Sequence, residues 1–390
     1  MAIANIEYIA NPQDITLELL SEILSNKVAS HDLKPLGKGA MSNVQILTIE
    51  YDKSINKNEE LPIQFIVKFK KPEIPLPDLF SVEAEFYRLT ESISNEPSSF
   101  PFQLVKAYAA GSSWLMLHFI SHSGITTYDV HEGCPTSLFD ELLVAMAKMH
   151  SYFWIYDEDQ SANGSGTILK YHSQKLSATP GAGHSLPISE RQKLFLPAWP
   201  AFRDRLSLYI KDSDSLQMME GIVEWTAADD HIEKSAFLVS LRKWTIVHGD
   251  FHIGNLLVNK TTPWLVDWSM AGVGNPLVDL VFFLVVGAPN ISTDGSDTAT
   301  SASVERVLKL YHTALNNQNP MLSWDQLVLN FRLCLLNQLI ILVCYDELCR
   351  DMADSFQDER VVYHAHFDRV NVRCVKMLLS DFGWVDDMFR

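Results

Sequence analysis

The chain has 390 residues, of which 47% are apolar and 20% are charged, and it contains 20 Phe, 12 Tyr and 9 Trp. This composition excludes disordered and low-complexity proteins, and the length predicts two domains rather than one. The formal net charge of −17 disfavours nucleic acid or an anionic membrane as the main partner, because both bind to a basic face. A cationic small-molecule substrate is compatible with this charge but is not required by it, since acidity usually serves solubility.

Cysteine usage and the N-terminal residues favour a cytoplasmic protein. The chain has five cysteines without CxxC or Cys/His ligand spacing, which predicts neither a disulfide framework nor a structural zinc site. The start, MAIANIEYIANPQD, lacks the basic and long apolar regions of a signal peptide. Residues 327–344 are apolar enough to suggest a membrane span, but polar residues such as Arg332 and Asn337 interrupt them. We expect a core helix there and no membrane partner.

Residues 1–120 predict a small sheet with one helix inserted after its third strand. Apolar residues recur at helical spacing from Ile15 to Val28 and predict a first helix. The following patterns predict two strands joined by a turn in 36–51, a strand in 61–70, an amphipathic helix in 81–93 and two strands in 103–120.

Residues 121–390 predict a larger, mainly helical domain. Helices are expected at 138–152, 189–210, 215–225, 232–241, 304–314 and 325–349. The polar segment 157–187 is either a lid over a substrate or a long connection without function, and 290–303 is expected to be an exposed loop. The block 244–268 interrupts the helices with short apolar strands.

The polar residues with the greatest chemical potential lie in this block. Asp250 follows a short apolar strand, Asn255 opens the next strand, and Asp267 closes its hairpin partner, so we expect the three side chains to converge. Carboxylate and carboxamide oxygens are ligands that Mg²⁺ prefers, and a neighbouring carboxylate can accept the proton of an attacking hydroxyl. Each residue alone would more often be a turn former, but the combination favours a site.

The run HGDFHIGNLLVNKTTPWLVDW, residues 248–268, resembles the catalytic and metal-binding segment of the aminoglycoside phosphotransferase and choline kinase-like family. The later run GNPLVDL, residues 274–280, is most similar to the ecdysteroid-kinase-like branch. The resemblance implies a bilobal α+β fold of the protein-kinase type, ATP and Mg²⁺ as cofactors, and a small-molecule hydroxyl as phosphoryl acceptor. It implies that Asp250 orients and deprotonates this hydroxyl, and that Asn255 and Asp267 hold Mg²⁺.

A nucleotide-binding turn is expected between the first two strands of the N-terminal sheet. Gly37 and Gly39, followed by Ser42 and Asn43, form a segment whose backbone N–H groups could approach phosphate closely. A single GxG segment is more often a plain hairpin turn, but its position in the series of elements favours phosphate binding.

Lys68 lies inside an apolar strand, where a charge needs a partner. The Glu-x-x-Phe-Tyr pattern of the resembling family selects Glu83 as this partner and implies that Lys68 binds the α- and β-phosphates. Glu85 is then expected at the surface.

The resemblance also implies roles for residues that do not react. Backbone groups of His118, Phe119 and Ile120 are expected to bind adenine where the last strand leaves the small lobe. His248 is expected to hold the catalytic loop by packing and hydrogen bonding, and Asp279 to brace this loop from a helix start. Whether His252 faces the substrate stays open.

Departures from protein kinases favour a small-molecule acceptor. Gly249 replaces the arginine that protein kinases place between His and Asp, and only twelve residues separate Asp267 from Asp279, too few for a peptide-docking segment. Aromatic residues in the expected acceptor region either contact a ring-bearing substrate or simply pack helices: Phe195, Trp199, Phe202, Tyr209 and Trp225.

Two other classes of protein are alternatives to a kinase. One is a catalytically silent kinase-fold protein that binds nucleotide, and the other is a metal-dependent hydrolase that uses His248, Asp250 and His252. The sequence leaves open the identity of the acceptor, the choice of ATP or GTP, and whether the protein is a monomer or a dimer.

Overall fold

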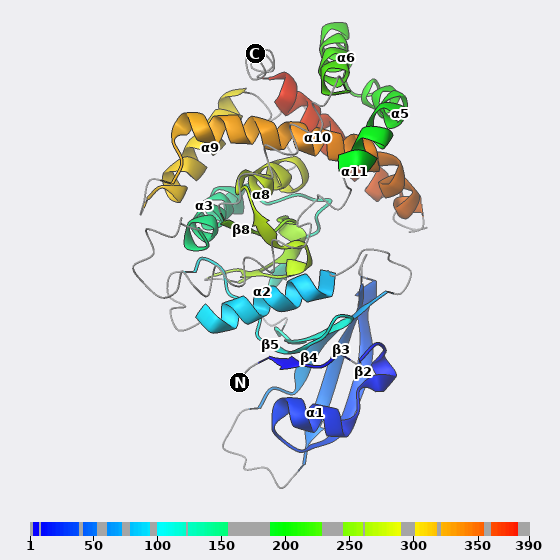
Figure 1. Cartoon of the computed structure of the whole chain (residues 1–390), viewed down its shortest axis with the longest axis vertical. Helices are drawn as coiled ribbons and strands as arrows, with labels where there is room; N and C mark the ends of the chain where they lie inside the picture. Colours follow the sequence, from blue (N-terminus) through cyan, green and yellow to red (C-terminus); the bar gives the residue numbers. More distant parts are fainter. Residues whose placement is uncertain are drawn as a thin grey trace. The chain divides into compact units, whose positions relative to one another are not determined.

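The structure is a computed structural model that describes residues 3–7, 9–38, 42–52, 61–71, 79–93, 100–121, 124–154, 188–227, 245–259, 262–289, 301–317, 321–354 and 360–380. The chain forms two compact units (Figure 1). The first unit comprises the described residues within 1–126 and 257–271, and the second comprises those within 127–154, 188–256 and 272–380. The segment 257–271 thus groups with the N-terminal unit, whereas the predicted domains 1–120 and 121–390 assign it to the C-terminal one.

The first unit is built on a six-stranded sheet in the order β1-β5-β6-β4-β3-β2. Its strands are β1 (Ala4–Asn5), β2 (Val28–Lys38), β3 (Ser42–Tyr51), β4 (Gln64–Lys70), β5 (Ala107–Ala110) and β6 (Trp114–His118). All neighbours pair antiparallel except β1, which pairs parallel with β5. In β4, Phe65, Val67 and Phe69 are buried in alternation with half-buried residues, which is the pattern of a strand with one face on a core.

Two longer helices accompany this sheet. Helix α1 (Leu17–Leu24) begins at Thr16, whose Oγ1 accepts a hydrogen bond from Leu19 N at 3.2 Å, and it ends where Ser25 adopts a left-handed conformation with φ 52°. The predicted helix through Val28 is therefore wrong at its end, because Val28 already belongs to β2. Helix α2 (Leu79–Ile93) follows the third long strand as predicted.

Two short strands and a 3₁₀ turn lie at residues 256–270. Strands β9 (Leu256–Val258) and β10 (Trp264–Leu265) form a three-stranded sheet with β7 (Thr126–Thr127). The 3₁₀ turn η5 (Trp268–Met270) packs on α2, with the Trp268 ring stacked on Phe86 at a centroid distance of 3.6 Å. This contact attaches the segment 257–271 to the first unit.

The second unit is mainly helical. Its longer helices are α3 (Thr136–Tyr152), α5 (Ile188–Leu206), α6 (Ser213–Ala227), α9 (Ser301–Leu315), α10 (Trp324–Asp354) and α11 (Arg360–Leu379). Strand β8 (Thr245–Val247) pairs with β11 (Gly272–Gly274), and helix α8 (Leu277–Phe282) continues into a π-helical turn, η6 (Phe283–Gly287).

Three predicted segments lie wholly or mostly outside the described residues: the helix at 232–241, the polar segment 157–187 and the loop 290–303. Helix α11 is not predicted by the sequence patterns, whereas α8 begins near Asp279, where the resemblance implies a helix start. The predicted α+β class, with a small sheet unit followed by a larger helical unit, is confirmed.

Helix α10 contains the apolar segment that suggests a membrane span. Within the described residues, one helix is long and apolar enough to cross a membrane by length and composition, and 67% of its most apolar stretch is buried in the protein. It packs on α5, α8, α9 and α11. These contacts are those expected of a core helix.

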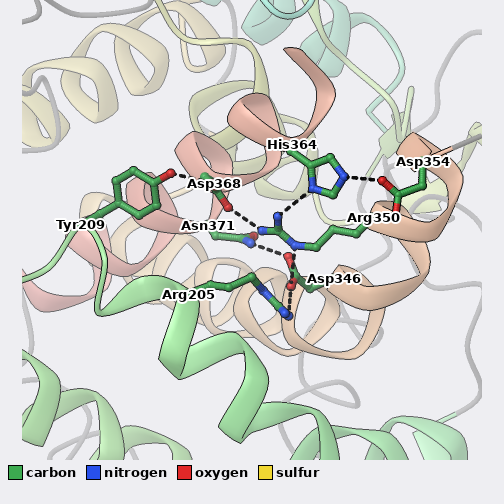
Figure 2. Close-up of polar contacts among 8 residues, drawn as sticks. All are labelled: Arg205, Tyr209, Asp346, Arg350, Asp354, His364, Asp368 and Asn371. Carbon is green, nitrogen blue, oxygen red and sulfur yellow. Dashed lines mark hydrogen bonds and ion pairs between the residues drawn. The ribbon is translucent and has the colours of Figure 1, made fainter. Parts of the chain in front are cut away.

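A polar network ties α5, α10 and α11 together (Figure 2). The buried carboxylate of Asp346 accepts hydrogen bonds from Arg205, from Arg350 Nε at 3.1 Å and from Asn371 Nδ2 at 2.6 Å. Arg350 also reaches Asp368 on α11, at 2.5 Å. The network supplies partners for charges that these packed helices take out of water.

Candidate active site

The catalytic loop predicted from the sequence leaves the buried strand β8. Gly249 has φ 83°, a left-handed conformation that favours glycine, and this turns the chain sharply between His248 and Asp250. The fully buried carboxylate of Asp279, near the start of α8, accepts hydrogen bonds from His248 N and Gly249 N, both at 2.7 Å. The predicted brace by Asp279 is confirmed, and it fixes the backbone that carries Asp250.

His248 lies in the core of this loop. Its ring is fully buried, packs edge-to-face with Phe251, and accepts a hydrogen bond through Nδ1 from Asp250 N at 3.2 Å. The predicted structural role of His248 is confirmed. Because Nδ1 already accepts a backbone N–H, this nitrogen is not available to a metal.

A second layer of buried polar residues supports Asp279, and the sequence did not reveal it. His150 on α3 bonds to Asp279 Oδ2 through Nε2 at 3.0 Å and to the Tyr311 hydroxyl through Nδ1 at 2.6 Å. His150 and Tyr311 are both fully buried. One feature of the sequence could have indicated that His150 is buried. It lies four residues after Met146 and seven after Leu143, and so on the same apolar face of the helix.

Asp250, His252 and Asn255 form a compact polar group on this loop. Asn255 donates from Nδ2 to the Asp250 carbonyl at 2.9 Å and to its carboxylate Oδ2 at 3.1 Å. His252 Nε2 lies 3.4 Å from the same carboxylate oxygen. The Asp250 side chain remains 33% exposed. The carboxylate is therefore held in place and still open to a substrate.

The first unit contains the second group of predicted residues. Lys68 Nζ on β4 contacts both carboxylate oxygens of Glu83, at 2.9 and 3.0 Å, and Asp267 Oδ1 at 3.1 Å. Burial alone would lower the pKa of Lys68, but the carboxylates of Asp267 and Glu83 raise it above its ordinary value. Lys68 therefore carries its charge inside the protein.

The structure pairs Lys68 with Glu83 rather than Glu85, as expected. The expected surface position of Glu85 is wrong, because this residue is 7% exposed. Its carboxylate lies 3.6 Å from the guanidinium of Arg88, one turn further along α2. Helix α2 thus buries two acidic residues, and each has a cationic neighbour.

The expected phosphate-binding turn joins β2 and β3. Gly37 pairs with Val44, and Lys38 with Asn43, so the two strands stay paired up to the described end of β2, and Ser42 opens β3. A register shift lies between Pro35 and Gly37. Gly39 lies outside the described residues.

The residues expected to bind adenine lie at the end of β6. His118 N donates to Lys106 O at 2.8 Å, and Phe119 N donates to Gln64 O at 3.3 Å. Two of the three expected backbone donors are thus engaged within the sheet. Ile120 N makes no hydrogen bond to any described residue.

Asn255 and Asp267, the residues expected to hold Mg²⁺, have side-chain oxygens of the kind that this ion prefers. Asn255 uses its amide nitrogen for Asp250, which turns its carbonyl oxygen elsewhere, and the Asp267 side chain is 43% exposed. In the described parts of the chain, no three His, Cys, Asp or Glu side chains are grouped so that they could hold a metal alone. Mg²⁺ does not need such a cage, because it usually binds one or two protein oxygens together with phosphate and water.

Residues 64–315 match the family model described as the phosphotransferase enzyme family. The chain therefore belongs to this family. The prediction of a small-molecule kinase related to aminoglycoside phosphotransferases and choline kinases is confirmed, while the ecdysteroid-kinase-like branch stays a prediction.

Several solved structures are similar to the chain. A spectinomycin phosphotransferase in complex with ADP and spectinomycin is 13% identical, with 95% of this chain and 98% of that chain covered and a TM-score of 0.49. The choline kinase of Cryptosporidium parvum is 12% identical, with 92% and 91% covered and a TM-score of 0.46. The macrolide 2'-phosphotransferase of Brachybacterium faecium is 16% identical, with 90% and 97% covered and a TM-score of 0.43. A search of curated proteins found no match.

Proposed function

We propose that this phosphotransferase transfers phosphate from ATP, with Mg²⁺, to a hydroxyl group of a small molecule. One observation carries the proposal. Asp250 is a partly exposed carboxylate that is fixed by Asn255 on a loop whose backbone Asp279 clamps. A fixed, accessible carboxylate is what a hydroxyl acceptor needs for orientation and for removal of its proton.

The remaining predicted residues have complementary roles in this proposal. Lys68, held by Glu83, neutralises charge on the α- and β-phosphates. Asn255 and Asp267 supply oxygens to Mg²⁺, which when bound would neutralise phosphate charge. Gly37, Gly39, Ser42 and Asn43 cover the phosphates, and Ile120 N serves as the adenine donor among the residues 118–120.

The acceptor is proposed to be a small hydroxylated molecule rather than a protein. The short interval between Asp267 and Asp279 supports this, since β11 and the start of α8 occupy it and leave no room for a peptide-docking segment. Phe195, Trp199 and Phe202 are at most 9% exposed and so pack helices rather than line an acceptor site. Tyr209 is 51% exposed, but its hydroxyl donates to Asp368 at 2.6 Å, so only its ring face is open to a ligand.

We also propose a cytoplasmic location, without a nucleic acid or membrane partner. All five cysteines are free thiols in the structure, which suits a reducing compartment. The alternative, a silent nucleotide-binding protein, differs from the proposal in one measurable property: it would bind Mg-ATP without transferring phosphate.

Substitution of Asp250 tests the proposed function. Asp250→Asn should reduce ATP consumption across a panel of hydroxylated metabolites by at least about a thousandfold, because the proton acceptor is lost while the shape is kept. Mg-ATP binding, measured by calorimetry, should stay within about threefold of the wild type, since Asp250 is not a nucleotide ligand in this proposal.

Asp140→Asn is the matched control, because Asp140 is an exposed carboxylate of the same unit that pairs with Arg306. It should leave turnover unchanged. Equal turnover by Asp250→Asn and wild type would rule out the assignment of Asp250. Nucleotide binding by the wild type without any turnover would favour the silent alternative.

A further inference from the structure

Tyr87 on α2 carries a buried hydroxyl group that the proposed function does not use. This residue ends the Glu-x-x-Phe-Tyr pattern that selects Glu83, and it is 1% exposed. No described residue makes a hydrogen bond with its hydroxyl, and this oxygen is closed to solvent. A buried hydroxyl without a partner costs free energy, which makes Tyr87 a candidate for a role in a state with bound ligand.

We propose that Tyr87 is a positioning residue that takes the place of Lys68 on the Glu83 carboxylate when Lys68 turns to the phosphates of a bound nucleotide. The inference rests on the proposed function, because it requires that Lys68 binds phosphate. The Tyr87 hydroxyl acts through Glu83 and Lys68 and does not touch the nucleotide itself.

Helix α2 places the Tyr87 side chain beside Glu83. Residues four apart lie on the same face of a helix, and side chains lean towards the preceding turn, so Tyr87 leans towards the turn that carries Glu83. Both residues are 1% exposed. Burial, together with the negative charges of Glu83 and Asp267, raises the pKa of the Tyr87 hydroxyl. The hydroxyl therefore lies near the two carboxylates that hold Lys68.

Lys68 has no unused hydrogen in this arrangement. An ammonium group has three hydrogens, and Lys68 Nζ contacts three carboxylate oxygens: both of Glu83, at 2.9 and 3.0 Å, and Asp267 Oδ1 at 3.1 Å. To bind the α- and β-phosphates it must give up two of these contacts. The Asp267 side chain is 43% exposed and can turn to other partners, but one oxygen of Glu83 then loses its donor as well.

The Glu83 carboxylate needs a replacement for this donor from within the protein, because its side chain is only 2% exposed. It keeps a hydrogen bond from the backbone N–H of Trp268, but a buried charge that loses a donor is costly. The Tyr87 hydroxyl is a nearby group whose hydrogen no described residue accepts. Donation from Tyr87 to Glu83 lets Lys68 keep one contact with Glu83 while it binds phosphate.

Tyr87→Phe tests the proposal, because it removes the hydroxyl and keeps the ring. In the nucleotide-free chain it should raise the midpoint of thermal unfolding by about 1 to 2 °C, since an unpartnered buried hydroxyl is lost. It should weaken Mg-ATP binding about tenfold in calorimetry, because Glu83 then has no replacement for Lys68. A lower midpoint without nucleotide, or a Kd for Mg-ATP equal to that of the wild type, would overturn the proposal.

Tyr51→Phe is the matched control, because Tyr51 is a tyrosine of the same unit whose hydroxyl has a partner. It donates to Pro62 O at 3.0 Å. Its loss should lower the midpoint of thermal unfolding by about 1 to 2 °C and leave the Kd for Mg-ATP within about twofold of the wild type. The two substitutions should therefore have opposite effects on stability, and only the one at Tyr87 should weaken nucleotide binding.

Adenosine separates the positioning of Lys68 from a general loosening of the first unit. It has no phosphate and so leaves Lys68 with its carboxylates. Tyr87→Phe should bind adenosine within about twofold of the wild type, and a tenfold loss for adenosine would overturn the proposal.

Failure of the proposed function gives a different result from failure of this inference. A wild type that does not bind Mg-ATP, or a Lys68→Ala variant that binds it as tightly as the wild type, would refute phosphate binding by Lys68 and this inference with it. Unchanged Mg-ATP binding in Tyr87→Phe alone would refute only the role of Tyr87.

Discussion

Asp267 adopts a left-handed backbone conformation, with φ 63° and ψ 65°, that few residues other than glycine adopt. Asp and Asn tolerate this region better than most residues, and such conformations often mark functional sites. Here the turn brings the Asp267 carboxylate to Lys68 at 3.1 Å. The backbone at this position therefore serves the ion pair as well as the turn, which explains why a short polar side chain follows the apolar strand β10.

His366 on α11 is a single residue that makes stability depend on pH. Burial, together with repulsion of a positive charge by the nearby side chains of His131, Arg369, Arg373 and His252, lowers its pKa to about 3. The ring of His131 lies 4.8 Å away between centroids. In the folded protein His366 is thus neutral over a range in which the unfolded chain, with an ordinary histidine pKa of about 6.5, is protonated.

The difference in the pKa of His366 between the folded and unfolded states predicts how stability changes with pH. Between about pH 6.5 and pH 3 the unfolded state binds one more proton at this residue, so the free energy of unfolding falls as the pH falls, by up to about 1.4 kcal/mol per pH unit. His366→Gln should flatten this dependence between pH 6.5 and 4.5 in urea denaturation. An unchanged slope would show that His366 is not the group responsible.

Helix α10 is held at its C-terminal half by charges rather than by apolar packing alone. Asp346, Arg350 and Asp354 occupy successive turns, and they contact residues before and after α10 in the sequence (Figure 2). Arg350 donates to His364 Nδ1 at 3.2 Å, and the other ring nitrogen of His364 lies 2.9 Å from Asp354 Oδ1. The network therefore runs from a buried end at Asp346 to an exposed end at Asp354.

This gradient of burial predicts unequal effects on stability. Asp346→Asn should lower the free energy of unfolding by about 3 to 5 kcal/mol, because the guanidinium groups of Arg205 and Arg350 lose their buried countercharge. Asp354→Asn is the control on the same helix, since this side chain is 52% exposed, and it should cost at most about 1 kcal/mol. Urea denaturation measures both, and equal effects would contradict a network centred on Asp346.

At the scale of the whole molecule, the region that matches the family model is shorter than the two folded units. The match spans residues 64–315, so β2, β3, α10 and α11 lie outside it. The first unit nevertheless includes β2 and β3 in its sheet, and the second includes α10 and α11 in its core. The outer elements are therefore integral to the folded units.

Nucleotide binding should be visible in the stability of the whole chain. A ligand present at about a hundred times its Kd stabilises the folded state by about 2.7 kcal/mol, so Mg-ATP should raise the midpoint of thermal unfolding by several degrees. Lys68→Ala should abolish this increase, because the buried ammonium group is the proposed phosphate contact.

Lys70→Ala is the control for this measurement, because Lys70 lies two residues further along the same strand and is only half-buried. It should keep the increase. A full increase in Lys68→Ala would show that this lysine does not bind the nucleotide.

Local patterns in the sequence were sufficient to predict much of this fold and the loop that carries Asp250. The alternation in β4 predicts its strand, the HGD segment predicts a loop after β8, and the pattern around Glu83 that resembles the family's identifies the partner of Lys68. These features are predictable because strand periodicity, turn chemistry and motif spacing depend on residues close together in the chain.

The other features of the fold and the site depend on packing between segments that are distant in the sequence. The support of Asp279 by His150 joins residues 129 positions apart, the burial of Glu85 depends on what α2 packs against, and the segment 257–271 groups with the first unit through contacts such as Phe86 with Trp268. None of these has a local signal, because burial and hydrogen-bond partners are properties of the folded chain and arise only when remote side chains meet.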